Sequence, residues 1–133
     1  MHGVSRYEDL ICWQLAHELE QEVFALTETG PASRDFKFRN QIRDSSSSAT
    51  RNIAEGFGRY WPPEFSNFML IARGSLVETH NSIRTGLDRG YFTREQAERM
   101  QRLAQRSRKA STGLIRYLES CREHPRTLNR PNL

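Results

Sequence analysis

Four separate stretches of this chain place apolar side chains at every third or fourth position, and this spacing constrains the fold more than any other feature. Apolar residues at such intervals share one face of a helix, which is buried only by packing against other helices. The stretches cover about residues 7–27, 36–55, 62–87 and 93–124. The sequence therefore predicts an all-α fold: an antiparallel up-down-up-down four-helix bundle of residues 1–124, followed by a mobile C-terminal tail, residues 125–133.

Local signals predict where the helices begin and end. Thr93 and Gln96 have the spacing of a capping box at the start of the fourth helix. Gly56 and Gly58 are expected to end the second helix, and Gly90 the third. The physical reason is that glycine adopts open or left-handed backbone conformations without a steric penalty.

A run of four serines, residues 45–48, lies inside the second stretch. Serine is a mediocre helix former because its hydroxyl competes for backbone hydrogen bonds. The apolar spacing nevertheless continues in phase across the run, which favours a helix whose small side chains let a neighbouring helix approach closely. A flexible linker is the alternative interpretation.

The sequence offers little for enzyme chemistry. None of the four histidines follows a glutamate by three residues, as a di-iron bundle requires, and no P-loop or serine-hydrolase motif occurs. Cys12 and Cys121 form no CxxC pair, so free thiols are expected. We therefore expect a non-enzymatic protein with no cofactor and no metal. A cytoplasmic location is also expected, because no signal-peptide pattern and no apolar run of about 20 residues is present.

Charge is distributed unevenly along the chain. Residues 1–30 carry one basic and six acidic side chains, whereas residues 99–133 carry nine basic and two acidic ones. Six basic residues of the predicted fourth helix are candidate contacts for nucleic-acid phosphates: Arg99, Arg102, Arg106, Arg108, Lys109 and Arg116. Four of them recur at intervals of three and four and so share a helix face. That face binds phosphates, or it pairs with the acidic first helix or an adjoining subunit. Because aromatic residues are sparse near it, backbone contacts are favoured over base stacking.

Several short motifs occur in a characteristic order. They are Tyr7-Glu8-Asp9-Leu10, Gln41-Ile42-Arg43, Ser48-Ala49-Thr50-Arg51-Asn52-Ile53-Ala54-Glu55-Gly56-Phe57-Gly58-Arg59, Glu64-Phe65 and Ile71-Ala72-Arg73-Gly74-Ser75-Leu76. Together they resemble the four-helix bundle family of ribosomal-RNA intervening-sequence proteins over about residues 7–120. The resemblance implies an up-down bundle that assembles into a homo-oligomeric ring, expected to be a homopentamer. It also implies kinship with the accessory proteins of diversity-generating retroelements, which bind nucleic acid and a reverse transcriptase, and it implies no enzymatic activity.

The same motifs contain two further groups of candidate residues. A polar cluster, either structural or partner-binding, is predicted from Asn52, Glu55, Arg59, Ser75 and Glu78. An aromatic group either covers the end of the core or anchors another subunit: Phe57, Tyr60 and Trp61.

These observations lead to one functional hypothesis and one alternative. The chain is expected to act as a homo-oligomeric scaffold or adaptor that binds the RNA or DNA backbone, or a nucleic-acid-processing enzyme, through its basic surface. The alternative is a protein–protein interaction module that binds no nucleic acid.

Overall fold

Four long helices make up the fold: α1 (Ile11–Leu26), α3 (Phe36–Arg59), α4 (Pro62–Asp88) and α5 (Arg94–Glu123). A 3-10 turn, η1 (Tyr7–Asp9), precedes α1, and the short helix α2 (Gly30–Arg34) lies between α1 and α3. The computed structural model describes residues 4–123, and that part of the chain contains no strand, so the predicted all-α class is confirmed. The predicted tail, residues 125–133, lies outside the described residues.

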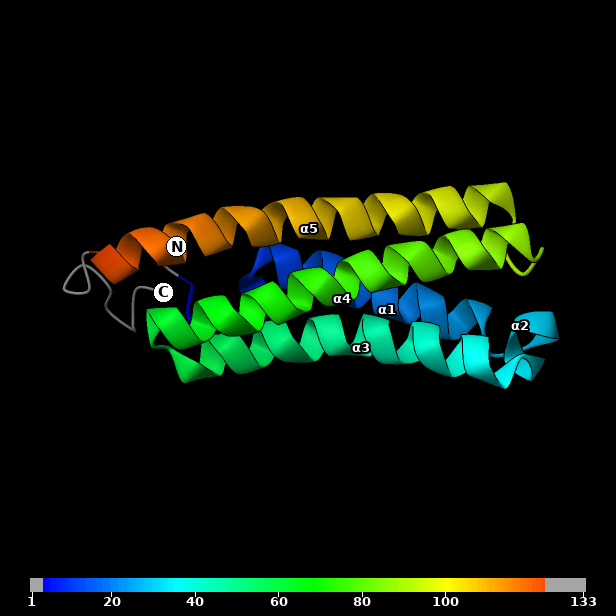
Figure 1. The fold of residues 1–133 in the computed structure, drawn as a ribbon, viewed down its shortest axis with the longest axis horizontal. Coiled ribbons are helices and arrows are strands. Elements are labelled where there is room, and N and C mark those ends of the chain that lie inside the picture. The colour runs from blue at the N-terminus through cyan, green and yellow to red at the C-terminus, as the bar shows by residue number, and fades with distance from the viewer. Residues whose placement is uncertain (1–3, 124–133) are drawn as a thin grey trace.

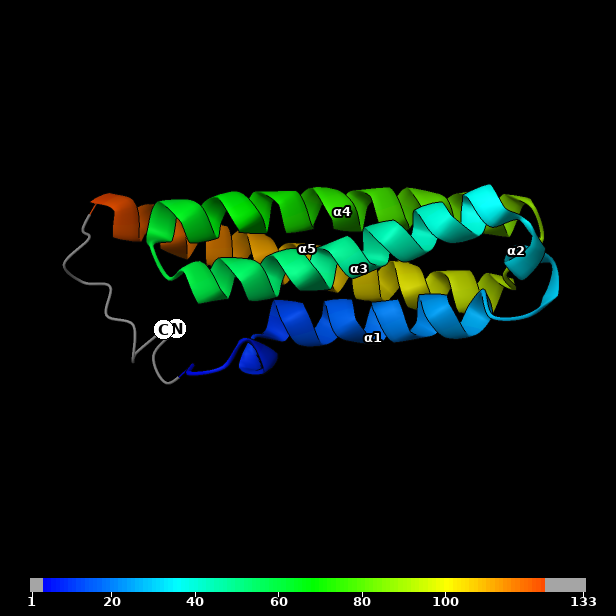
Figure 2. The ribbon, with the colours of Figure 1, turned by 90° about the horizontal axis from the view of Figure 1, so that it is seen from below.

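The four long helices lie side by side along one axis (Figure 1). The colour gradient passes along α1, back along α3, forward again along α4 and back along α5, so that consecutive long helices are antiparallel. Each long helix packs against two neighbours, because α1 and α4 both contact α3 and α5. Figure 2 shows the result, with α1 along one edge of the bundle and α4 along the opposite edge.

The core lies on the shared axis of the bundle and receives apolar side chains from every long helix. The largest fully buried apolar side chains are Leu19, Val23, Ile42, Ile53, Phe65, Met69, Leu76, Ile83, Met100 and Leu118. Along each helix these residues are separated by four residues or by sums of threes and fours, which is the spacing expected of a buried helix face. The periodicity that predicted the helices therefore also selects the core.

The chain enters α1 later than predicted. Residues 7–9 form η1, and Leu10 is extended with φ −73° and ψ 128°, so that α1 begins only at Ile11. The connection after α1 also differs, since it contains α2, where no helix was predicted. Pro31 stands in the first turn of α2, where its fixed φ favours helix and its missing N–H costs nothing.

The prediction that Gly56 and Gly58 end the second helix is wrong, because α3 continues to Arg59. Gly56 is buried against α4, and a Cβ built on it would lie 2.9 Å from both Phe65 Cδ1 and Phe68 Cβ. This glycine thus permits close contact between two helices, and does not end one. The chain turns instead at Tyr60, whose φ of 69° lies in the left-handed region.

The turn from α4 to α5 has the predicted end signals. Gly90 has a φ of 75°, and the Tyr91 N–H donates to the Gly86 carbonyl at 2.8 Å, the bond of a Schellman motif. The Thr93 N–H donates to Gln96 Oε1 at 2.9 Å, and the Gln96 N–H donates to Thr93 Oγ1 at 3.1 Å. Both halves of the predicted capping box are therefore formed.

The serine run belongs to the interior of α3, so the alternative of a flexible linker is wrong. Thr79 Oγ1 of α4 donates to Ser45 Oγ at 2.8 Å, and the hydroxyl oxygens of Ser48 and Ser75 lie 2.8 Å apart. These bonds satisfy hydroxyl groups that the close packing of α3 and α4 removes from water. Small polar side chains therefore hold this helix pair together at short range.

Asp35 joins the start of α3 to the turn before α5. Its Oδ1 accepts the Phe38 N–H at 3.3 Å, and its Oδ2 accepts the Tyr91 hydroxyl at 2.6 Å and Arg89 Nη1 at 3.0 Å. The Tyr91 hydroxyl, the Phe38 N–H and the Arg89 guanidinium hold the pKa of Asp35 below its ordinary value. A lowered pKa means that the carboxylate stabilises the fold above about pH 4, and that this contribution is lost as the pH falls through the lowered pKa.

We expect the variant Asp35→Asn to have a lower Tm than the wild type at neutral pH, because asparagine keeps the shape but loses the charge that Arg89 and Tyr91 contact. The difference in Tm should narrow as the pH falls below about 4, and it should vanish only below the lowered pKa, where the wild-type carboxylate is itself protonated. Thermal unfolding followed by circular dichroism across this range measures both effects. A difference that stays constant down to about pH 2.5 would show that the charge is not its source.

Candidate nucleic-acid interface

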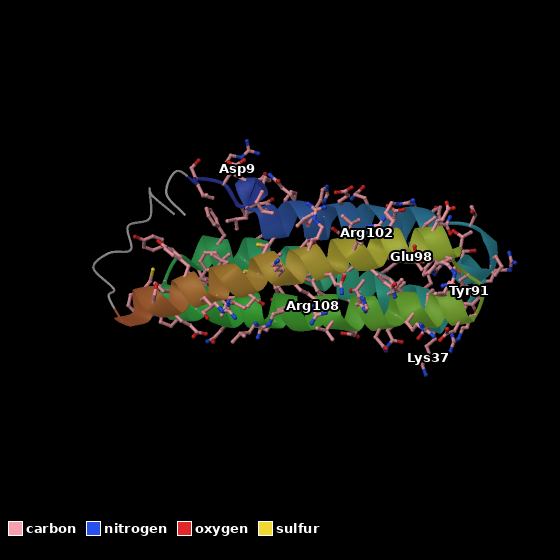
Figure 3. All side chains as sticks on the ribbon, turned by 90° about the horizontal axis from the view of Figure 1, so that it is seen from above. Asp9, Lys37, Tyr91, Glu98, Arg102 and Arg108 are labelled. Carbon is pink, nitrogen blue, oxygen red and sulfur yellow. The ribbon has the colours of Figure 1, made fainter. Side chains whose placement is uncertain are left out.

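Helix α5 has no acidic residue between positions 99 and 118, a segment that contains all six predicted basic contacts. Figure 3 looks onto this helix and shows that two of the six, Arg102 and Arg108, lie on different sides of it. Arg102 lies on the side of α5 that faces α1, whereas Arg108 lies at the seam between α5 and α4. The tertiary structure therefore divides the basic residues of α5 into groups with different surroundings.

Arg99 is neutralised within the chain. Its Nε donates to Glu22 Oε1 of α1 at 2.7 Å, and its Nη2 contacts the same oxygen. The Glu22 side chain is only 18% exposed, so the pair is partly shielded from water. The hydrogen bond to Glu22 also raises the pKa of Arg99. At this position the basic face pairs with the acidic first helix, as the alternative interpretation holds.

The exposed cations that remain of the predicted six form what we call the basic ridge: Arg102, Arg106, Lys109 and Arg116. Among residues 4–121, none of these four side chains makes a hydrogen bond or an ion pair. They recur at intervals of four, three and seven, which places them along one outer face of α5. Within that part of the chain, the ridge is thus a row of positive charges without counter-charges.

Beside the ridge, an open pocket of about 600 Å³ lies between α4 and α5. Its lining, which we call the basic pocket, consists of Arg73, Gln105, Arg106, Arg108, Lys109 and Thr112. Four of these residues are cations and none is a carboxylate. Arg73 comes from α4, and the charge pattern of the fourth helix does not indicate it. Its position within the family motif at residues 71–76 was the one available signal.

The two inner arginines of the pocket are held differently. Arg73 is half-buried and its Nη1 donates to Thr112 Oγ1 at 3.2 Å. Arg108 is also half-buried, but its Nε is buried and has no hydrogen-bond acceptor among the described residues. Burial of His80 and, after it, the charge of Arg108 lower the pKa of His80. The pocket thus concentrates positive charge at a site that is partly removed from water.

The structure brings together only part of the predicted polar cluster. Asn52 Nδ2 donates to the Ser48 carbonyl at 2.8 Å and to Ser48 Oγ at 3.0 Å. Since Ser48 also contacts Ser75, it joins Asn52 of α3 to Ser75 of α4. Sequence reasoning missed Ser48 as the connecting residue, although it stands one helical turn before Asn52.

The charged members of the predicted cluster lie outside this chain of hydrogen bonds. Arg59 Nε pairs with Glu55 Oε2 at 2.9 Å, with both side chains about half exposed at 51% and 53%. Glu78 is exposed and has no hydrogen bond or ion pair among the described residues. The motif residues therefore divide into two groups. Asn52 and Ser75 belong to a part-buried contact that fixes the register of α3 against α4, whereas Arg59 and Glu55 form a surface ion pair, which contributes little to stability.

The motifs of residues 48–59 and 64–76 thus contribute to the α3–α4 contact of a helical bundle. A model of the family described as 23S rRNA-intervening sequence protein matches residues 8–113. The chain belongs to this family. The resemblance found in the sequence is therefore confirmed. No curated protein matches the chain.

In this member of the 23S rRNA-intervening sequence family, the three predicted aromatic residues have different surroundings. Phe57 packs against the core, and its ring lies edge-on to Phe65 at a centroid distance of 6.1 Å. Tyr60 is half-buried at the turn, and Trp61, which precedes α4, is 52% exposed. Phe57 therefore covers the end of the core, while Trp61 is the residue of the three most accessible to another molecule.

The outer face of α4 carries an apolar patch that sequence reasoning missed, formed by Leu70, Ile71 and Val77. These side chains are 42%, 52% and 46% exposed. The signal was present in the sequence, because all three stand outside the apolar stripe that predicts the buried face of this helix. Large exposed apolar side chains that cluster on one surface mark a candidate contact with another molecule.

The remaining chemistry of the described residues is limited. Among them, no group of three or more histidine, cysteine, aspartate or glutamate side chains is placed to hold a metal ion. Cys12 and Cys121 are buried free thiols, and burial raises the pKa of Cys12 to about 11. None of the helices in the described part of the chain has the length and apolar character that crossing a bilayer requires.

Proposed function

We propose that this member of the 23S rRNA-intervening sequence family is a non-enzymatic, homo-oligomeric scaffold that binds the phosphate backbone of RNA or DNA through the basic ridge. The observation that carries this function is the row of four exposed cations on α5 that have no partner among the described residues. Neutralising phosphates with such a row releases condensed counterions, which supplies affinity without base recognition.

The charges of α1 favour nucleic acid over a purely protein-based partner. In the alternative function, the acidic first helix of one copy meets the basic face of the next. However, Glu22 is already paired with Arg99, and Glu28 Oε2 lies 3.2 Å from Arg43 Nη2. Glu20 accepts the Thr50 hydroxyl at 3.1 Å. Of the three acidic side chains of α1, Glu18 alone then makes no hydrogen bond or ion pair among the described residues, so little unpaired acid is left on this helix to meet the basic ridge of another copy.

Self-association is supported by the outer face of α4. Leu70, Ile71 and Val77 expose apolar surface there, and Gly74 between them leaves open space above the helix backbone. A second copy packed on this face would remove that surface from water. Assembly would also repeat the basic ridge, and several linked binding surfaces raise the overall affinity for one nucleic acid. We propose that several copies assemble into a ring, in keeping with the family resemblance. A measurement of the mass of the assembly in solution gives the number of copies.

The double variant Arg102→Glu/Arg106→Glu tests the proposed function. We expect its affinity for structured RNA and for duplex DNA at low salt to fall about tenfold or more, because the two side chains then repel the phosphates that they bind in the wild type. On duplex DNA, the slope of log affinity against log salt should become shallower by roughly 0.9 for each phosphate that is no longer neutralised. Fluorescence anisotropy over a salt series measures both quantities.

A matched control reverses two exposed arginines far from the ridge, Arg34 on α2 and Arg51 on α3. The variant Arg34→Glu/Arg51→Glu changes the net charge by the same amount and should keep most of the affinity. Equal losses in the two variants, or no binding by the wild type at low salt, would contradict the proposed interface. A ridge variant that also changes the sedimentation profile would instead favour the protein-interaction alternative.

A further inference from the structure

The basic pocket between α4 and α5 differs from the ridge in that its cations come from two helices. Arg73 projects from α4, while Arg106, Arg108 and Lys109 project from α5. A pocket of about 600 Å³ falls within the size range of small-molecule sites. Four cations around a cavity without a carboxylate repel one another, and an anion placed between them removes that repulsion.

The polar side chains of the pocket are suited to an oxyanion. Thr112 Oγ1 accepts the Arg73 Nη1 hydrogen at 3.2 Å, which leaves the hydroxyl hydrogen of Thr112 free to donate. Gln105 adds an amide with two further donors. The bond to Thr112 also fixes the Arg73 guanidinium before any ligand arrives. The pocket therefore combines charge with preorganised hydrogen-bond donors from two helices.

Arg108 supplies the second observation. Its Nε is buried without an acceptor among the described residues, which is unfavourable for a charged donor. Arg43 offers a contrast on the other side of the bundle, since its Nε donates to Thr27 Oγ1 at 2.8 Å and its Nη2 lies 3.2 Å from Glu28. Arg108 has no such carboxylate in its pocket, so none of the described lining residues compensates its charge.

We propose that the basic pocket is a discrete phosphate-binding site in which Arg73 and Arg108 clamp one phosphate group, while Arg106 and Lys109 continue the contact onto the ridge. A planar guanidinium donates two parallel hydrogen bonds to a phosphate, and two of them from different helices fix its position. The assignment of the natural ligand to nucleic-acid phosphates depends on the function proposed above. The pocket itself does not, since the same chemistry binds free phosphate or pyrophosphate.

The test uses the full-length chain and inorganic pyrophosphate as the probe. Isothermal titration at constant ionic strength should give saturable binding to the wild type. Arg73→Gln and Arg108→Gln should each raise the Kd about tenfold or more, because each removes a charged hydrogen-bond donor. Arg108→Lys keeps the charge but loses the planar fork, and should be intermediate. Arg51→Gln is the matched control, since this exposed arginine of α3 lies outside both the ridge and the pocket lining, and its Kd should stay near that of the wild type.

His80 supplies a readout that a merely structural role of the arginines would not change. Its pKa is lowered by burial and by Arg108, so an anion that neutralises Arg108 should raise the pKa of His80. A pH titration of its ring resonances by NMR, with and without pyrophosphate, measures this shift. The shift should be absent in Arg108→Gln.

The possible outcomes distinguish failure of the proposed pocket from failure of the proposed function. Competition of the bound pyrophosphate by an oligonucleotide would support both the pocket and its place in the nucleic-acid interface. Saturable pyrophosphate binding that no oligonucleotide displaces would support the pocket and overturn its assignment to nucleic-acid phosphates, while the ridge variant tests the proposed function separately. Equal binding of citrate would overturn the assignment to phosphate. A response no larger than that to chloride at the same ionic strength would overturn the site altogether.

Discussion

Replacing Phe65 by alanine is expected to lower the free energy of unfolding by about 3–5 kcal/mol. The ring is completely buried, lies edge-on to Phe57, and rests on the backbone of α3 at Gly56. Its removal leaves a cavity between α3 and α4 that rigid helices fill only in part. A loss of this size is a large fraction of the roughly 5–15 kcal/mol that stabilises an ordinary domain. Urea unfolding followed by circular dichroism measures it.

The matched control is the same substitution at Phe36. That ring is 64% exposed at the start of α3, and the Arg39 guanidinium carbon lies 5.1 Å from its centroid. Phe36→Ala should therefore change the free energy of unfolding by no more than about 0.5 kcal/mol. Similar losses at Phe65 and Phe36 would mean that the packing of α3 against α4 is not the source of stability.

Gly86→Ala is expected to destabilise the protein by about 1–3 kcal/mol, although alanine is normally the better helix former. A Cβ at this position would lie 2.4 Å from Phe92 Cε2 and 2.9 Å from Phe38 Cζ. Both rings are buried and close against each other, with a centroid distance of 5.8 Å, so neither has free space to move into. The midpoint of urea unfolding should fall accordingly.

Gly113→Ala serves as the control, because this glycine lies inside α5 and no atom of the described residues stands within 4 Å of its added Cβ. It should raise the free energy of unfolding by about 0.5–1 kcal/mol, the usual gain in a helix interior. Trimming the obstructing ring with Phe92→Leu should reduce the penalty of Gly86→Ala in a double-mutant cycle. Strict additivity of the two substitutions would contradict the steric explanation.

Several features of the fold follow from local sequence. Helix α4 begins at Pro62, and the capping box at Thr93 and Gln96 forms as predicted. Gly90 has the predicted positive φ. These signals can be recognised in the sequence because each one depends on the backbone and side chains of a few consecutive residues.

The candidate interface was predicted less completely, for a physical reason. The helical spacing of Arg102, Arg106 and Lys109 places them on one face of any helix they form. Whether a cation on that face has a counter-charge depends on which helix packs beside it. Arg99 meets Glu22, 77 residues earlier in the chain, and Arg73 contacts Thr112, which is 39 residues later.

The sequence by itself determined the helical periodicity, most helix ends, the basic face of α5 and the family to which the chain belongs. Only the tertiary structure decided which charges are neutralised, that Arg73 and Arg108 border one pocket, and that Gly56 lies within a helix against a phenylalanine ring. This division between local and tertiary features has one physical cause. Periodicity and capping are properties of neighbouring residues, whereas counter-charges, pockets and close approaches arise between segments that only the packing of the bundle brings together.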